Sequence, residues 1–278
     1  RVLQSLGACA VRVCVLSNRR GGCGPSPRPR RLPAMPHAVA RLRATCLATS
    51  PTRPHLDRGE PRKARCPRCR LVPSHCLCAL QPVVPTRAGF CLLMAAFEPL
   101  KPSNTGWLVA DVVPDTLAFA WSRVTVDPAL LALLDDPQWQ PVVVFPAEFA
   151  APERVVTELP PTGPEGGAGG RPLFILLDGT WSEACKIFRK SPWLNRFPVL
   201  SLHPDQLSRY RLRRSTHAHH FCTSEVAALC LAMAGDTHAA QVLEAWLDVF
   251  SSRYLRARQS VPVDLDDAAH QRLRALCP

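Results

Sequence analysis

The chain has 278 residues, 47% of them apolar, which is enough for one large domain or two small ones with a substantial buried core. Its formal net charge of +12 favours a polyanionic partner. Residues 1–65, however, hold 14 basic and two acidic residues, whereas the remaining chain holds 20 of each. A uniformly basic body is therefore excluded, and contacts with nucleic acid must come from local basic patches.

The first 34 residues differ in composition from the rest of the chain. They contain seven arginines, no acidic residue and the Pro/Gly/Arg-rich stretch Gly21–Pro33, so we expect residues 1–34 to be a disordered leader. We hypothesise that this leader is upstream sequence, not part of the native protein, before a start at Met35. The apolar stretch Val2–Leu16 is interrupted by polar side chains and does not read as a signal sequence. No run of about 18 apolar residues occurs, so we expect a cytoplasmic protein with no membrane-spanning helix.

Residues 35–87 are interpreted as an N-terminal helix followed by a small zinc knuckle. Helical character covers Ala38–Arg53, and four cysteines then fall within thirteen residues: Cys66, Cys69, Cys76 and Cys78. Four thiolates at this knuckle-like spacing are the ligand set of a closed, structural zinc site. The neighbouring side chains of Arg65, Arg68 and Arg70 would partly offset the negative charge of the centre.

Two other interpretations of the cysteine cluster remain open. Disulfides would use the same cysteines but are rare in the cytosol, and an iron–sulfur cluster also takes four cysteines but usually at other spacings. The other cysteines beyond the leader show no paired spacing, and we expect them to be buried or partly buried thiols.

Residues 88–258 have the pattern of an α/β domain. Continuous apolar runs of strand length occur at Phe90–Ala96, Pro141–Phe145 and Leu173–Leu177, with a weaker run at Phe197–Leu202. Helical patterns lie between and after these runs, at residues 129–134, 182–189, 224–234 and 239–256. Strands that are buried on both faces and alternate with helices predict a mostly parallel sheet. Residues 259–278 are expected to form a C-terminal tail.

A carboxylate follows the third apolar run. The sequence Leu173-Phe-Ile-Leu-Leu-Asp178-Gly-Thr-Trp-Ser-Glu183 ends a strand, turns at glycine and begins a helix, with Thr180 and Glu183 as a capping box. Ligands of open parallel sheets bind outside the carboxyl ends of the strands, which is where Asp178 is expected. Position alone leaves Asp178 as either a turn-forming or a functional residue, and Trp181 as either a core residue or a stacking platform.

These residues resemble a known family. Asp178-Gly-Thr-Trp181 fits the D-x-T-W signature of the DTW-domain proteins, which are tRNA-uridine aminocarboxypropyltransferases. The four-cysteine knuckle and four further segments resemble family counterparts in order: Glu98–Gly106, Val143–Pro146, Lys186–Pro192 and Cys222–Val226. Many relatives carry a histidine-containing strand end where this chain has Ala95-Ala96-Phe97, which argues against any role for a histidine there.

The resemblance implies a SPOUT-like fold with a trefoil knot and a specific reaction. The 3-amino-3-carboxypropyl group of S-adenosylmethionine is transferred to N3 of a uridine in the tRNA variable loop, and methylthioadenosine is released. We assign the catalytic residues as Asp178, Thr180 and Trp181, with Asp178 as the base that removes the N3 proton. Contacts with S-adenosylmethionine are predicted, mostly through backbone groups, from Ser103, Asn104, Thr105, Gly106, Phe145 and Pro146.

Two basic clusters are candidates for phosphate contacts with tRNA. One comprises Lys186, Arg189 and Lys190, and the other includes Arg211, Arg213 and Arg214. Taken alone, each cluster is more typical of a solvated surface than of a binding surface, and only the family resemblance makes the two interpretations about equal. No obligatory protein partner is evident. Two alternative functions remain: a methyltransferase of the same fold that uses S-adenosylmethionine, and a non-enzymatic RNA-binding protein with a zinc knuckle.

Overall fold

The computed structural model describes residues 36–49, 64–159, 170–202 and 221–277. All of these belong to one compact unit that extends from Pro36 to Pro278. The predicted leader, residues 1–34, lies outside the described residues, as does the second basic cluster of Arg211, Arg213 and Arg214.

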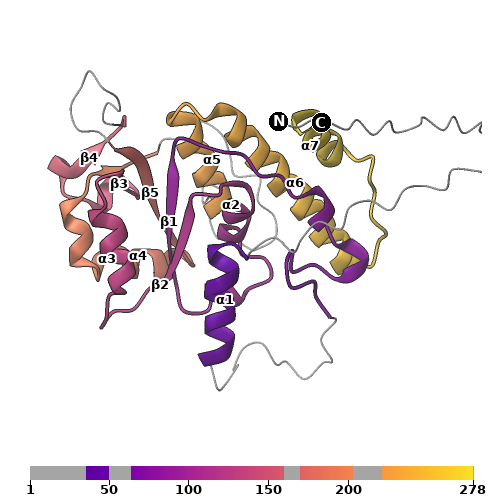
Figure 1. Cartoon of the computed structure of the whole chain (residues 1–278), viewed down its shortest axis with the longest axis horizontal. Helices are drawn as coiled ribbons and strands as arrows, with labels where there is room; N and C mark the ends of the chain where they lie inside the picture. The colour runs from indigo at the N-terminus through magenta and orange to yellow at the C-terminus, as the bar shows by residue number, and fades with distance from the viewer. Residues whose placement is uncertain (1–35, 50–63, 160–169, 203–220, 278) are drawn as a thin grey trace, which may run out of the picture. The chain divides into compact units, whose positions relative to one another are not determined.

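The described residues form a six-stranded sheet in which every pair of neighbouring strands is parallel. The strand order is β2-β1-β5-β3-β6-β4 (Figure 1). The strands are β1 (Gly89–Met94), β2 (Thr116–Ala120), β3 (Trp139–Val144), β4 (Val155–Val156), β5 (Arg171–Asp178) and β6 (Val199–Leu200). The central position of β5 places its end, and therefore Asp178, between the ends of β1 and β3.

Helices cover both faces of this sheet (Figure 1). The helices are α1 (Ala38–Thr49), α2 (Gly106–Val112), α3 (Pro128–Asp135), α4 (Trp181–Arg189), α5 (Thr223–Met233), α6 (Thr237–Gln259) and α7 (Ala268–Leu276). Helices α3 and α4 pack on one face, and α2, α5 and α6 contribute to the core on the other.

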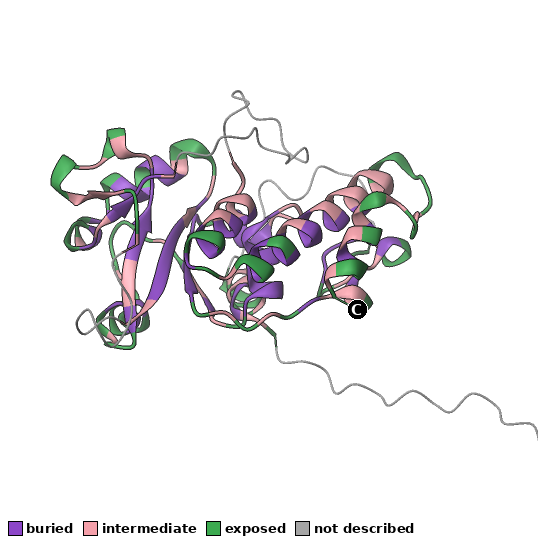
Figure 2. Ribbon diagram, turned by 90° about the horizontal axis from the view of Figure 1, so that it is seen from above, coloured by how far each residue is buried: buried purple, intermediate pink, exposed green. Residues whose placement is uncertain are grey.

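Each central strand divides its side chains between two apolar cores. In β1, Phe90, Leu92 and Met94 join the core that contains α2, α5 and α6, while Cys91 and Leu93 join the core that contains α3 and α4. Successive strand residues point to opposite faces, so a strand covered on both sides must be apolar throughout. Figure 2 shows the buried strands between the two helical layers. Because the central strands are buried on both faces, they appear in the sequence as unbroken apolar runs.

The prediction of a mostly parallel α/β fold is confirmed, and each of the four apolar runs contains a strand. Strands β2 and β4 and helix α2 were not predicted. Strand β2 lies at an edge of the sheet and has a mixed burial pattern, while β4 has only two residues, so neither produces a strong apolar signal. Because residues 203–220 lie outside the described residues, the trefoil knot remains a prediction.

The predicted C-terminal tail contains a helix. Residues 268–276 form α7, and Leu273, only 4% exposed, joins the same core as α6. Asp267 caps α7 by accepting a hydrogen bond from the backbone N–H of His270 at 2.9 Å. The side chain of Arg272 pairs with Glu244 and Asp248 of α6. The short amphipathic pattern of α7 therefore completes the packing of α6.

We predict that Leu273→Ala lowers the free energy of unfolding by about 2–4 kcal/mol, because it leaves a cavity between α6 and α7. Urea unfolding monitored by circular dichroism would measure the change. The matched control is Leu265→Ala, since Leu265 is 55% exposed in the same C-terminal segment and should cost less than about 0.5 kcal/mol. Equal effects of the two substitutions would contradict a packing role for α7.

Candidate functional site

The segments that follow β1, β3 and β5 meet at the carboxyl edge of the sheet, and we call this region the carboxyl-edge site. Strands β1 and β3 flank β5, so the chain after each of them passes beside Asp178. The backbone N–H of Ala95, just after β1, donates to the backbone oxygen of Asp178 at 2.9 Å. The topology therefore brings together residues from distant parts of the sequence at the edge where open parallel sheets bind ligands.

Asp178 ends β5 and is 2% exposed, so its carboxylate is buried. One oxygen accepts a hydrogen bond from Asn104 Nδ2 at 2.7 Å, and the other accepts one from Thr223 Oγ1 at 2.6 Å. Both donors are distant in sequence, so Asp178 is more than a local turn former. A Cβ atom added to Gly106 would lie 2.6 Å from Asp178 Oδ2, so glycine at residue 106 allows the start of α2 to approach the carboxylate.

Asn104 connects Asp178 to a second buried acid. Its side chain is 0% exposed, and Nδ2 also donates to Glu98 Oε1 at 3.2 Å, while Oδ1 accepts from the backbone N–H of Trp107 at 2.8 Å. Glu98, 1% exposed, is paired with Lys101. Buried carboxylates are costly unless they are paired or hydrogen-bonded, and this network satisfies both requirements.

The start of α5 forms another wall of the site. Cys222 precedes the helix, and its backbone N–H donates to Glu225 Oε2 at 2.8 Å as part of a capping box. Burial raises the pKa of the Cys222 thiol well above its ordinary value, against the opposing effect of a hydrogen bond with Thr105. The cap orients the first turn of α5 so that Thr223 can donate to Asp178.

An aromatic column lies on the α4 side of the sheet, whereas the side chains that contact Asp178 come from the α2 and α5 side. The ring of Phe145, after β3, stacks on Phe188 with centroids 4.5 Å apart and on Trp181 with centroids 5.6 Å apart. The ring of Phe149 packs edge-on against Trp181. Trp181 is 43% exposed, which excludes the interpretation of Trp181 as a core residue. The column places a partly exposed indole next to the strand end that carries Asp178.

The residues predicted to contact S-adenosylmethionine occupy two of these segments. Ser103 is partly buried, Asn104 and Thr105 are buried, and Gly106 begins α2. Phe145 and Pro146 follow β3, with Phe145 buried in the aromatic column. Thr180 caps α4 and forms the predicted capping box with Glu183, so that local prediction is confirmed. The structure thus places all predicted catalytic and cofactor residues at one edge of the sheet, while their individual roles remain predictions.

Sequence reasoning missed three residues of this network: Glu98, Thr223 and Arg70. Glu98 and Thr223 lie within segments that resemble the family, but nothing in the sequence distinguishes them from their neighbours. Arg70 was expected to offset the charge of a zinc centre, whereas its guanidinium donates to the backbone oxygen of Asn104. Only the tertiary structure reveals these contacts.

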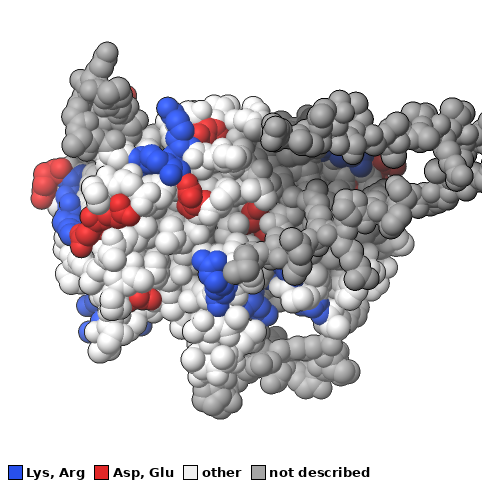
Figure 3. Space-filling model, in the orientation of Figure 1, with Lys and Arg blue, Asp and Glu red and all other residues white. Residues whose placement is uncertain are grey.

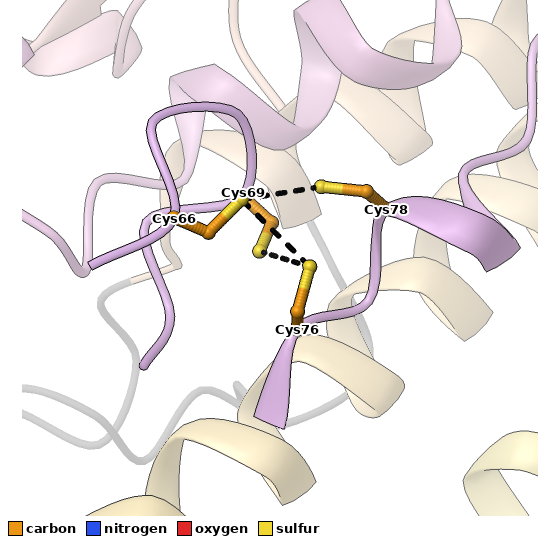
Figure 4. Close-up of side chains that lie close together, drawn as sticks. All are labelled: Cys66, Cys69, Cys76 and Cys78. Atoms are coloured by element: carbon orange, nitrogen blue, oxygen red, sulfur yellow. Dashed lines mark hydrogen bonds between the residues drawn. The ribbon is translucent and has the colours of Figure 1, made fainter. Parts of the chain in front are cut away.

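The four cysteines of the predicted knuckle lie close together, with their side chains directed toward one another (Figure 4). Their sulfur atoms all lie within 4.8 Å of one another, and the closest pairs are 3.5 Å (Cys66 and Cys78), 3.6 Å (Cys69 and Cys76) and 3.7 Å (Cys66 and Cys76). Tetrahedral zinc with Zn–S bonds of about 2.3 Å requires sulfur separations of roughly 3.8 Å. The cluster could therefore hold a zinc ion.

The protonation of these thiols also bears on metal binding. Burial would raise the pKa of Cys66, but hydrogen bonds from the backbone amides of Cys69 and Arg68 and from neighbouring thiols outweigh it and lower the pKa to about 7. Burial raises the pKa of Cys69 to about 11, with a further contribution from the charges of Cys66 and Cys76. Four adjacent thiolates thus need a cation to be stable together, which a bound metal would supply.

The first basic cluster is on the surface. Lys186, Arg189 and Lys190 are all exposed along and just after α4. On the face of the molecule shown in Figure 3, basic and acidic side chains are intermingled. Exposure makes the α4 cluster available for phosphate contacts, and such a role remains a prediction.

The fold and the site define a parallel α/β protein with a potential zinc knuckle and a polar, aromatic site at the carboxyl edge of its sheet. The family model of the DTW domain matches residues 63–255, so the chain belongs to the DTW-domain family. This membership confirms the resemblance and supports a function in tRNA modification. No solved structure matches the chain. Within the described ranges, no helix is both long enough and apolar enough to cross a membrane.

We predict that Cys76→Ser abolishes the binding of about one zinc ion per chain, because a closed structural site needs all four ligands. Metal analysis of the purified protein would measure zinc content. Cys277→Ser is the matched control, since Cys277 is exposed and lies outside the cluster. Undiminished zinc in Cys76→Ser would rule out the four-thiolate site.

We predict that Gly106→Ala destabilises the protein by about 1–3 kcal/mol, because the new methyl group collides with Asp178. Urea unfolding would measure this change. In an Asp178→Ala background the collision with the carboxylate is removed, so Gly106→Ala should then cost less. A double-mutant cycle with no coupling between the two positions would refute this account.

Proposed function

We propose that the protein transfers the 3-amino-3-carboxypropyl group of S-adenosylmethionine to N3 of a tRNA uridine in the variable loop. The observation that carries the proposal is the juxtaposition of the D-x-T-W residues with the Glu98–Gly106 segment at the carboxyl edge of the sheet, in a chain of the DTW-domain family. A buried carboxylate and a partly exposed indole suit a reaction on a nucleobase held beside a nucleoside cofactor.

The proposed reaction is a nucleophilic substitution at carbon. Uridine N3 attacks the methylene carbon bonded to the sulfonium, the C–S bond breaks with its electrons moving to sulfur, and methylthioadenosine leaves. Three carbons surround the sulfonium, so the protein must select one by orientation. The residues proposed to orient the cofactor are those after β1 and β3, and Asp178 is the proposed acceptor of the N3 proton.

Hydrogen bonds hold this proposed base in a fixed direction. Asn104 and Thr223 each donate to a different oxygen of Asp178, so the carboxylate cannot rotate without breaking one of them. Asn104 and Thr105 also bring the predicted cofactor segment into contact with β5 and α5. In this proposal, the exposed basic residues of α4 contact tRNA phosphates and the cysteine knuckle carries a structural zinc ion.

The proposal predicts two products when the purified protein is incubated with S-adenosylmethionine and unmodified tRNA. Mass spectrometry should detect methylthioadenosine and a uridine heavier by the aminocarboxypropyl group. S-adenosylhomocysteine with a methylated nucleoside would instead identify a methyltransferase. If neither modified nucleoside forms although tRNA binds, the non-enzymatic alternative would replace the proposal.

The same assay tests Asp178. Asp178→Asn keeps the size of the side chain but removes its basicity, so we expect turnover to fall by about 10²- to 10⁴-fold with a smaller change in affinity for S-adenosylmethionine. Asp115→Asn is the matched control, because Asp115 precedes β2 at the opposite edge of the sheet and is paired with Arg171. If cofactor affinity and turnover fell together, Asp178 would be a binding residue and not the base.

A further inference from the structure

Arg70 is an arginine in an unusual position. It directly follows Cys69, is only 2% exposed, and has a left-handed backbone with a φ of 64°. Left-handed conformations are costly for residues other than glycine, and a buried guanidinium is costly unless its donors are satisfied. Two unfavourable features at one residue indicate that the surrounding structure holds Arg70 in place for a reason.

The cysteine knuckle fixes the backbone of Arg70. Its N–H donates to the backbone oxygen of Cys66 at 2.8 Å, and the N–H of Cys66 donates to the backbone oxygen of Leu71 at 2.7 Å. The turn from Cys66 to Leu71 thereby closes on itself, with two potential metal ligands inside it. The direction of the Arg70 side chain therefore depends on the geometry of the knuckle.

The guanidinium of Arg70 extends from the knuckle to the carboxyl-edge site. Its Nη1 atom donates to the backbone oxygen of Asn104 at 2.9 Å and to that of Lys101 at 3.4 Å. The guanidinium carbon lies 4.4 Å from the ring centre of Trp107 and 5.2 Å from that of Phe250. These aromatic contacts hold the cation in a dry environment, where its hydrogen bonds are strong.

Asn104 is hydrogen-bonded to both Arg70 and Asp178. The backbone oxygen of Asn104 accepts from Arg70, while its side-chain nitrogen donates to Asp178 at 2.7 Å. One residue therefore separates the knuckle arginine from the buried carboxylate. A displacement of the backbone at Asn104 would break or lengthen the hydrogen bond to Asp178.

The opposite side of the knuckle is anchored as well. Arg253 of α6 donates to the backbone oxygen of Cys76, and its Nε atom is hydrogen-bonded to His270 Nε2 of α7 at 2.9 Å. His75 Nε2 and the backbone oxygen of Val261 are 2.9 Å apart. The knuckle is thus fixed to the C-terminal helices on one side and contacts the site through Arg70 on the other.

We propose that Arg70 is a positioning residue that couples the cysteine knuckle to the carboxyl-edge site. The metal-organised turn orients its guanidinium, the guanidinium holds the backbone of residues 101–104, and Asn104 then holds Asp178. The predicted effect on affinity for S-adenosylmethionine rests on the proposed function. The predicted effect on the order of residues 98–108 does not.

The decisive variant is Arg70→Gly. Glycine adopts a positive φ without strain, so the turn and its metal ligands should be retained while the guanidinium is removed. Hydrogen–deuterium exchange by mass spectrometry should show at least about tenfold faster exchange in residues 98–108, which include the amides of Asn104 and Trp107, because a buried hydrogen-bonding anchor is lost. Zinc content and exchange in β3 should stay unchanged.

Arg68→Ala is the matched control. Arg68 lies in the same turn, between Cys66 and Cys69, but it is exposed and its side chain donates to Gln81 at 3.2 Å. It should leave exchange in residues 98–108 unchanged. Removal of zinc from the wild-type chain with a chelator should reproduce the effect of Arg70→Gly, so the proposal can be tested even if that variant fails to fold.

The affinity for S-adenosylmethionine, measured by calorimetry, provides the second readout. We expect a loss of about tenfold in Arg70→Gly and none in Arg68→Ala. The coupling would be overturned if residues 98–108 exchanged at the normal rate in Arg70→Gly or in the zinc-depleted protein. It would also be overturned if Arg70→Gly lost its zinc. Failure of the wild-type protein to bind S-adenosylmethionine would contradict the proposed function, while the exchange measurement would still decide the role of Arg70.

Discussion

The carboxylate of Asp178 is the group on which the organisation of the carboxyl-edge site depends. A buried carboxylate needs hydrogen-bond donors, and its donors come from Asn104 before α2 and from Thr223 at the start of α5. The same requirement explains the glycine at residue 106, because a side chain there would occupy the space of the carboxylate. One electrostatic constraint therefore fixes the relative positions of β5, α2 and α5.

The peripheral parts of the chain support this arrangement through a small number of polar contacts. The cysteine knuckle contributes Arg70 to the loop that precedes α2, and α6 contributes Arg253 to the knuckle. The C-terminal helix α7 in turn contributes His270 to Arg253. In the proposed coupling, the N-terminal knuckle and the C-terminal helix together support a site that lies in neither of them.

The site combines two kinds of surface whose chemistry suits a nucleoside. Asp178 accepts hydrogen bonds from an amide and a hydroxyl group, whereas Phe145, Phe188 and Trp181 form a stacked column on the α4 side of the sheet. Aromatic stacking tolerates many ring systems, and directed hydrogen bonds select among them. This division of roles agrees with membership of the DTW-domain family and with the proposed transfer between a nucleoside cofactor and a uridine.

The sequence alone determined the features that depend on local patterns. Unbroken apolar runs identified β1, β3 and β5, and a weaker run identified β6. The spacing of four cysteines identified the knuckle, and Thr180 and Glu183 identified the start of α4. Tertiary structure decided which distant residues meet. The strand order places β5 between β1 and β3, the packing leaves Trp181 partly exposed, and the fold brings Arg70 to the backbone of Asn104. Periodicity reports which face of an element is buried, but not which element covers it, so contacts between distant segments could not be obtained without the fold.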